Sequence, residues 1–218
     1  IFLFWIVFFA LIAENFGEET KPDSYIITGH WSKLAYETAN TKTKIIVDID
    51  NTSNRHTQKT VLDLDSLNDK RSFIHYVENE TVDGYRLNLI KNIDIPVIVD
   101  MSSSLFGKEI DFNNFDVIYS SSSKHLAIAG FSIVLIRNSV LANLNKKIPS
   151  ILSYKHYHET SSIPCTPPTA SIILADQIIK YMMKYDLKYY EDISNKKAAA
   201  FYKLISESSI YINNVSQA

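Results

Sequence analysis

Short apolar runs separated by polar turns make up most of the first two thirds of the chain. Several runs are apolar throughout rather than alternating, which is typical of strands buried on both faces of a sheet. Their β-branched and aromatic residues also favour strands. The predicted strands cover residues 25–28, 44–49, 72–77, 96–100, 116–120 and 131–137.

The pattern changes after Pro167 and Pro168. Residues 169–187 and 194–208 both carry apolar side chains at helical spacing. An earlier helix is predicted over 32–39, with Ser32 as its N-terminal cap. The polar segment 50–70 is interpreted as a surface connection. The sequence therefore predicts an α/β protein that ends in helices.

The chain opens with thirteen uncharged residues, IFLFWIVFFALIA, and has no initiator methionine. This run is too short to span a bilayer, which needs about 20 apolar residues. It suits either a buried core segment or the hydrophobic region of a targeting signal, and no basic segment precedes it to decide. We expect the chain to be a fragment or a processed form.

Charge and cysteine content indicate which partners and which cellular location to expect. The 22 basic and 24 acidic residues among 218 nearly cancel, and no Lys/Arg cluster alternates with aromatic residues, which disfavours nucleic acid. The single cysteine, Cys165, cannot form an internal disulfide, so a cytoplasmic location is expected and a membrane is disfavoured. Sequons at Asn51, Asn79 and Asn214 point weakly toward secretion.

Four chemically distinct side chains come at or shortly after the ends of predicted elements. Asp100, Thr81 and Lys124 follow three strands, and Trp31 follows a fourth. Open α/β sheets bind ligands outside the carboxyl ends of their strands, so these residues are expected to converge. An acid, a hydroxyl, a lysine and a flat aromatic suit pyridoxal phosphate. Lysine bonds its aldehyde, the acid holds a proton on the ring nitrogen, and the aromatic covers the ring.

Each of these residues also has an ordinary interpretation. Lys124 suits a solvated loop, Asp100 a strand-end cap, Trp31 the core and Thr81 a turn. The local sequence around these residues, and the order in which the segments follow one another along the chain, together favour the cofactor interpretation. From about residue 24 onward the chain resembles the phosphoserine aminotransferase family in the segments TGHWSKLA, HYVENETVDG, VIVDMSSSLFGKEID, VIYSSSSKHLAIAGFSIVLIR and SSIPCTPPTASI.

The resemblance implies a fold and an activity. The fold would be the large domain of fold-type I pyridoxal-phosphate enzymes, a mostly parallel sheet flanked by helices. Residues 1–24 would be an apolar segment and linker, 25–190 the cofactor-binding domain, and 191–218 a helix leading to a small C-terminal domain outside the chain. Members are homodimers with shared active sites. They transfer an amino group between glutamate and 3-phosphohydroxypyruvate, giving O-phosphoserine for serine biosynthesis and 2-oxoglutarate.

The resemblance also implies roles for individual residues. Lys124 would bond the cofactor, Asp100 would pair with its ring nitrogen, Trp31 would stack on the ring, and Thr81 would hydrogen-bond to it. The first two would be the catalytic residues.

Cofactor phosphate would be held partly by Thr166, reaching across the dimer. Thr166 precedes a proline pair that suits the first turn of a helix, where free N–H groups attract anions. Ser123 and Cys165 stand where the family has glutamine and asparagine. A serine hydroxyl still donates to phosphate but reaches less far.

Other departures leave two alternatives open. His125 stands where the family has asparagine, and the family's glycine-rich phosphate turn and substrate-binding arginines have no counterpart in this chain. The alternatives are a diverged, catalytically impaired homologue, or a secreted or tethered binding protein on the same scaffold.

Two further patterns are weaker. His156 and His158 would share a face in an extended segment, but no third ligand follows at metal-site spacing, so no metal is expected. Cys165 is interpreted as a small residue at a helix entrance rather than a nucleophile. The tyrosine-rich helix around Met182 and Met183 is expected to contact the core or a second subunit.

Overall fold

The computed structural model describes residues 3–39, 44–48, 71–87, 94–144 and 146–212, of which 3–6 and 44–48 are described by their backbone alone. A six-stranded sheet forms its centre, in the order β2-β1-β3-β6-β7-β8. Neighbouring strands are parallel except β8, which is antiparallel to β7. The strands are β1 (Asp23–Ile27), β2 (Lys44–Asp48), β3 (Ile74–Val77), β6 (Val97–Asp100), β7 (Val117–Ser121) and β8 (Ser132–Ile136).

All six predicted strands are present, which confirms the mostly parallel α/β fold. Their ends differ from the prediction by one or two residues. A small second sheet, β4 (Asn79–Glu80) paired with β5 (Tyr85–Arg86), was not predicted. Its strands are only two residues each, which is too short to carry an apolar pattern.

Helix α2 (His30–Thr38) begins two residues before the predicted start, and its cap is Gly29. The prediction of Ser32 as the cap is therefore wrong. Ser32 lies in the first turn, where its hydroxyl oxygen accepts hydrogen bonds from the Thr28 and Gly29 N–H groups, at 2.9 and 3.1 Å. The expected cap failed because the groups that satisfy this helix end come from the distant β4–β5 hairpin.

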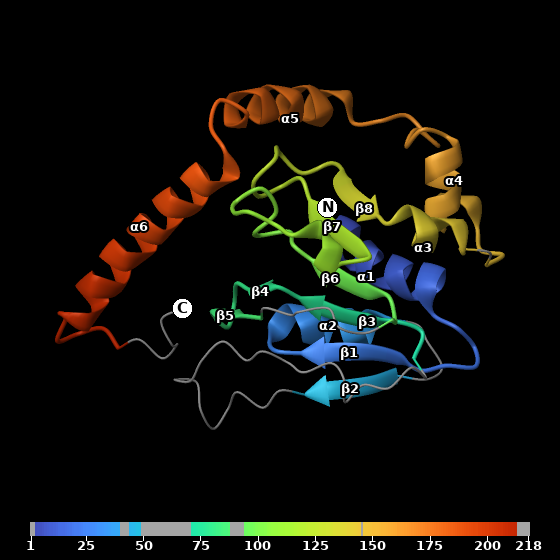
Figure 1. The fold of residues 1–218 in the computed structure, drawn as a ribbon, viewed down its shortest axis with the longest axis horizontal. Coiled ribbons are helices and arrows are strands. Elements are labelled where there is room, and N and C mark those ends of the chain that lie inside the picture. Colours follow the sequence, from blue (N-terminus) through green and yellow to red (C-terminus); the bar gives the residue numbers. More distant parts are fainter. Residues whose placement is uncertain (1–2, 40–43, 49–70, 88–93, 145, 213–218) are drawn as a thin grey trace.

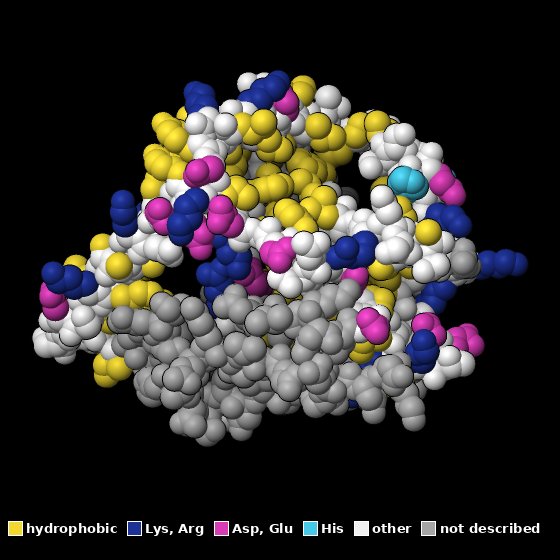
Figure 2. Space-filling model, in the orientation of Figure 1, with side chains coloured by type: hydrophobic (Ala, Val, Ile, Leu, Met, Phe, Trp, Pro, Cys, Tyr) yellow, Lys and Arg dark blue, Asp and Glu magenta, His cyan; other side chains and the backbone are white. Residues whose placement is uncertain are grey.

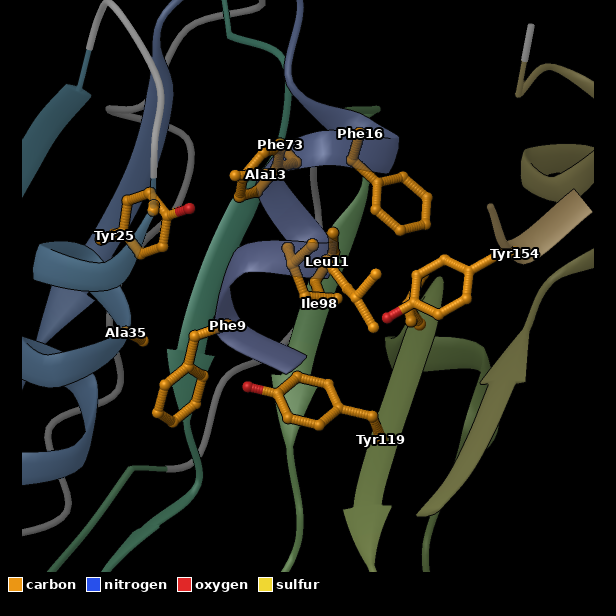
Figure 3. Close-up of a cluster of buried hydrophobic side chains, with 13 residues drawn as sticks. Phe9, Leu11, Ala13, Phe16, Tyr25, Ala35, Phe73, Ile98, Tyr119 and Tyr154 are labelled. Atoms are coloured by element: carbon orange, nitrogen blue, oxygen red, sulfur yellow. The ribbon is translucent and has the colours of Figure 1, made fainter. Parts of the chain in front are cut away.

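Strand register divides the sheet into two faces. Tyr25 is paired with His75, His75 with Ile98, and Asp100 with Tyr119, so these side chains share one face. Helices α1 (Leu3–Phe16) and α2 belong to the apolar core on that face (Figure 3). The opposite face carries Ile26, Ile74, Tyr76, Val97, Val99 and Ile118.

Helix α1 contains much of the apolar opening run. Phe9, Ile12 and Ala13 are buried, and Figure 3 shows Phe9 and Leu11 lying against the strands. The structure thus supports the buried-core alternative for this segment. At about 1.5 Å per residue, fourteen residues reach only about 21 Å, short of a bilayer. In the described part of the chain, no helix is both long and apolar enough to cross a membrane.

Short helices connect β8 to the C-terminal part: α3 (Asn138–Ala142), a 3-10 turn at Ser150–Leu152 and α4 (Tyr154–Glu159). Another 3-10 turn, Phe112–Asn114, lies between β6 and β7. Then α5 (Thr169–Met182) and α6 (Leu187–Ser206) form an arc around the sheet (Figure 1). The predicted domain boundary at 190/191 falls inside α6. The predicted connection at 50–70 lies outside the described residues, as do Asn51 and Asn214.

Candidate functional site

Asp100 ends β6 in the interior, with 2% of its surface exposed. Its Oδ1 atom accepts a hydrogen bond from the Ser102 N–H at 2.7 Å. Its Oδ2 atom is buried and has no hydrogen-bond partner among the described residues. Burial raises the pKa of Asp100 to about 6, against the opposing effects of the Ser102 hydrogen bonds and the charge of Lys124. Asp100 therefore presents an unsatisfied acceptor from a fixed carboxyl group.

Lys124 lies on the loop between β7 and β8, exposed and close enough to influence the charge of Asp100. The serines before it shape that loop. Ser122 is fully buried; its hydroxyl donates to the Ile128 carbonyl at 2.8 Å, and its carbonyl accepts from the Ala127 N–H at 2.7 Å. The serine run thus holds closed the loop that presents the lysine.

Ser102 connects the acid to the lysine loop. Its N–H donates to Asp100, and its hydroxyl oxygen accepts from the Ser121 N–H at 3.1 Å. Ser121 in turn shares a hydrogen bond with Ser123, with 2.9 Å between the hydroxyl oxygens. A continuous set of hydrogen bonds therefore runs from the carboxyl group to the residue before Lys124.

Trp31 and Thr81 are in direct contact. The indole Nε1–H of Trp31 donates to the Thr81 hydroxyl at 3.1 Å, and the His30 ring lies edge-on to the indole at 4.9 Å between centroids. Trp31 comes from the first turn of α2, whereas Thr81 follows β4, about fifty residues later. The structure thus brings together two of the predicted residues through a contact that sequence alone did not indicate.

A buried polar pair lies on the same face of the sheet as Asp100. His75 Nε2 is 2.7 Å from the Tyr119 hydroxyl oxygen, and Tyr119 is the register partner of Asp100. Burial lowers the pKa of His75 to about 3, so the imidazole is neutral. Burial, with a smaller contribution from Asp100, raises the pKa of Tyr119. Sequence reasoning missed this pair, although His75 and Tyr119 stand in predicted strands.

The remaining predicted residues lie on exposed segments. Ser123 is exposed beside Lys124. Cys165 and Thr166 are exposed on the connector between α4 and α5, and within the described residues no hydrogen bond joins either to Asp100 or Thr81. Their expected role lies across a subunit interface, so it stays a prediction.

The histidine pair is helical rather than extended, because α4 contains both His156 and His158. Residues two apart on a helix do not face the same way, so the shared face that an extended segment would have given them does not form. Among the described residues, no group of three His, Cys, Asp or Glu side chains could hold a metal ion.

The chemistry of these side chains is of the kind that suits a flat heteroaromatic ring with a protonated ring nitrogen and a reactive carbonyl. Asp100 Oδ2 can accept one N–H, Lys124 has a primary amine, and Trp31 is aromatic. Glu80 accepts a hydrogen bond from the backbone N–H of Trp31, and this role was not predicted. Its one local signal is its place directly before Thr81 at the end of a strand.

Comparison with known proteins gives a consistent result. Residues 8–218 match the family model described as aminotransferase class V. Curated proteins named phosphoserine aminotransferase match from Haemophilus influenzae, 32% identical over 213 residues, and Pseudoalteromonas translucida, 34% identical over 213 residues. Each alignment covers 96% of this chain, and 58% and 59% of the relatives. The chain therefore spans somewhat more than half the length of these relatives.

Solved structures agree with the sequence matches. Phosphoserine aminotransferase from Bacillus circulans subsp. alkalophilus is 27% identical with a TM-score of 0.85, covering 93% of this chain and 56% of that one. The pyridoxal-phosphate-bound phosphoserine aminotransferase from Trichomonas vaginalis is 25% identical with a TM-score of 0.83, covering 97% and 60%.

Proposed function

Because the chain belongs to the aminotransferase class V family, we propose that it is the cofactor-binding part of a phosphoserine aminotransferase. The whole protein would use pyridoxal phosphate to transfer an amino group between glutamate and 3-phosphohydroxypyruvate, as in serine biosynthesis. The relatives named above support this choice within the family, because the matches extend over nearly all of this chain.

The observation that carries the proposal is the buried Oδ2 atom of Asp100, which has no hydrogen-bond partner among the described residues. Leaving a buried acceptor unsatisfied costs about 1–3 kcal/mol, and a donor on a bound ligand would remove that cost. A protonated pyridine nitrogen supplies the missing donor. Asp100 is also held in place by Ser102, which fixes the direction from which that donor must approach.

The other residues would complete a site that suits the cofactor. Lys124 would hold the cofactor through its amine and would move the substrate proton; Trp31 would cover the ring, and Thr81 would offer a hydroxyl. When bound, the cofactor supplies an electron sink next to the reacting carbon. Ser123 would donate to its phosphate. Cys165 and Thr166 would do so from a second subunit, near the positive end of α5.

We also propose that the protein is a homodimer. Large apolar side chains remain exposed along α5, at its C-terminal cap and along α6; examples are Ile173 at 58%, Met183 at 78% and Phe201 at 61%. Figure 2 shows hydrophobic side chains gathered beneath α5. Patches of this kind mark interfaces. The core alternative expected for Met183 is wrong, because this side chain is exposed, and contact with a second subunit remains.

Covalent trapping tests the proposed function. The full-length protein is incubated with pyridoxal phosphate, reduced with borohydride and digested, and the labelled peptide is identified by mass spectrometry. We expect the label on Lys124, together with turnover of glutamate and 3-phosphohydroxypyruvate. A label on Lys108, which is ion-paired with Glu78, or on Lys155 in α4 would contradict the assignment.

A further inference from the structure

The first turn of α2 is capped by carboxylates from the β4–β5 hairpin rather than by its own sequence. Glu80 accepts hydrogen bonds from the Trp31 N–H and the Ser32 N–H, both at 2.8 Å. Asp83 accepts from the His30 N–H at 2.7 Å. The three N–H groups that open the helix are thus all taken by one hairpin, which leaves none of them for a ligand anion.

The hairpin lies so close to α2 that a side chain at Gly29 would displace the carboxylates of the hairpin. A Cβ atom at Gly29 would lie 2.4 Å from Asp83 Oδ2 and 2.9 Å from Glu80 Cδ. The hairpin is closed by Gly84, whose φ of 69° favours glycine and whose N–H donates to the Glu80 carbonyl at 2.8 Å. Both glycines therefore allow the two carboxylates to come close to the N-terminal end of α2.

Glu80 is fully buried, and no cation among the described residues pairs with it. Its charge is balanced by the two N–H groups and the positive end of α2. The pKa of Asp100, raised mainly by burial, is raised further by the charge of Glu80, which places Glu80 near the proposed cofactor nitrogen site. A buried carboxylate in this position is costly, and local capping by Ser or Asp would satisfy the helix without it.

We propose that Glu80 is a positioning residue that fixes Trp31 and Thr81 as one unit. The Trp31 main chain is bound to Glu80, and its indole is bound to Thr81, the next residue in sequence. Two hydrogen bonds to consecutive hairpin residues therefore restrain both the backbone and the ring of Trp31. This inference rests on the proposed function for what Trp31 and Thr81 touch, although the clamp itself is a property of the protein alone.

The clamp is tested first without cofactor. The 218 residues contain two tryptophans, so Trp5→Phe leaves Trp31 as the only one among them, and any tryptophan elsewhere in the full-length protein is also replaced by phenylalanine. In that background Glu80→Gln keeps one acceptor oxygen but loses the charge and one of the two backbone hydrogen bonds. We expect time-resolved fluorescence anisotropy to show a larger amplitude of fast indole motion. Glu37→Gln, on the exposed part of the same helix, is expected to match the parent protein. Unchanged indole motion in folded Glu80→Gln would overturn the proposal.

The second arm separates positioning from stability. We expect Glu80→Gln to raise the Kd for pyridoxal phosphate about tenfold, as loss of a charge-assisted hydrogen bond predicts. Ser32→Ala also weakens the helix end, because it removes the acceptor for Thr28 and Gly29, but it leaves both Glu80 hydrogen bonds in place. If Ser32→Ala lowers stability as much and raises Kd equally, Glu80 acts through stability alone and the proposal fails.

Failure of the proposed function would look different. In that case the parent protein itself would show no label on Lys124 after reduction. The comparison of indole motion between Glu80→Gln and Glu37→Gln needs no cofactor, so it decides the clamp in either case.

Discussion

The Nε2 atom of His75 lies 2.7 Å from the hydroxyl oxygen of Tyr119, and both rings are buried. The two residues stand on β3 and β7, with β6 between them, and share the face of the sheet that carries Asp100. Three polar side chains thus share this face of the sheet, and burial shifts the pKa of each of them toward the neutral form.

Acid stability should depend on His75. Its pKa is about 3 in the folded protein and near 6.5 when unfolded, so the unfolded state binds more protons between these values. The stability associated with neutral His75 is complete above pH 6.5 and is lost as pH falls toward 3, by about 1.4 kcal/mol per pH unit at most. His75→Gln keeps a hydrogen-bonding group without titrating. Urea unfolding from pH 7 to 4 should show a shallower decline for this variant, and parallel curves would contradict the assignment.

Asp100 should act in the opposite direction. Its folded pKa of about 6 lies above the usual 3.8, so folding favours protonation, and the ionised group destabilises the cofactor-free protein above pH 6. This cost disappears as pH falls from 6 toward 4. Asp100→Asn should therefore stabilise the cofactor-free protein at pH 8, by at most about 3 kcal/mol. Urea midpoints at pH 8 and pH 4 measure the difference, and a destabilised variant at pH 8 would disprove this interpretation.

Local patterns were sufficient to predict the sheet and two of its strand-end residues. Apolar β-branched runs marked all six strands, and the ends of two of them located Asp100 and Lys124. These features depend only on neighbours in sequence.

Features that depend on distant partners were not predicted. In the sequence, Glu80 resembles a surface acid in a polar segment. Only in the folded chain does its carboxylate accept hydrogen bonds from the N–H groups of Trp31 and Ser32, about fifty residues earlier. The same holds for Tyr119, whose hydroxyl forms a hydrogen bond with His75 across an intervening strand. Polar residues carry no periodic signal for the partner that satisfies them.

The Lys124 loop should depend on Ser122 more than on its neighbours. Ser122→Ala removes the hydroxyl donated to the Ile128 carbonyl in a fully buried position, at a cost of about 1–2 kcal/mol. We expect a lower thermal midpoint and slower borohydride-dependent labelling of Lys124. Ser123→Ala, at an exposed position, is the matched control for stability and should leave the midpoint unchanged. Equal midpoints for the two variants would show that the buried hydrogen bond does not hold the loop.

A charge among the exposed apolar side chains of α5 and α6 should weaken the proposed dimer. Ile173→Glu places a carboxylate in a position that a second subunit would bury, and an unpaired buried charge should raise the dimer dissociation constant about 100-fold or more. Phe112→Glu makes a similar change at an exposed apolar residue outside α5 and α6. Sedimentation velocity over a concentration series should find monomer for the first variant only. Dimers of equal strength in both variants would place the interface elsewhere.

Amino-group transfer should depend on the charge of Asp100 more than cofactor binding does. A neutral amide at this position still fills the space next to Ser102, but it does not hold a proton on the ring nitrogen. For Asp100→Asn in the full-length protein we expect labelling of Lys124 to persist, while transfer from glutamate to the cofactor slows on the order of 100-fold or more. Stopped-flow absorbance under single-turnover conditions measures this step directly. Asp111→Asn alters an exposed carboxylate that caps the 3-10 turn at Phe112–Asn114, so it should leave the rate unchanged. A rate for Asp100→Asn equal to that of Asp111→Asn would remove Asp100 from the ring nitrogen, and its unpartnered oxygen would then need another donor.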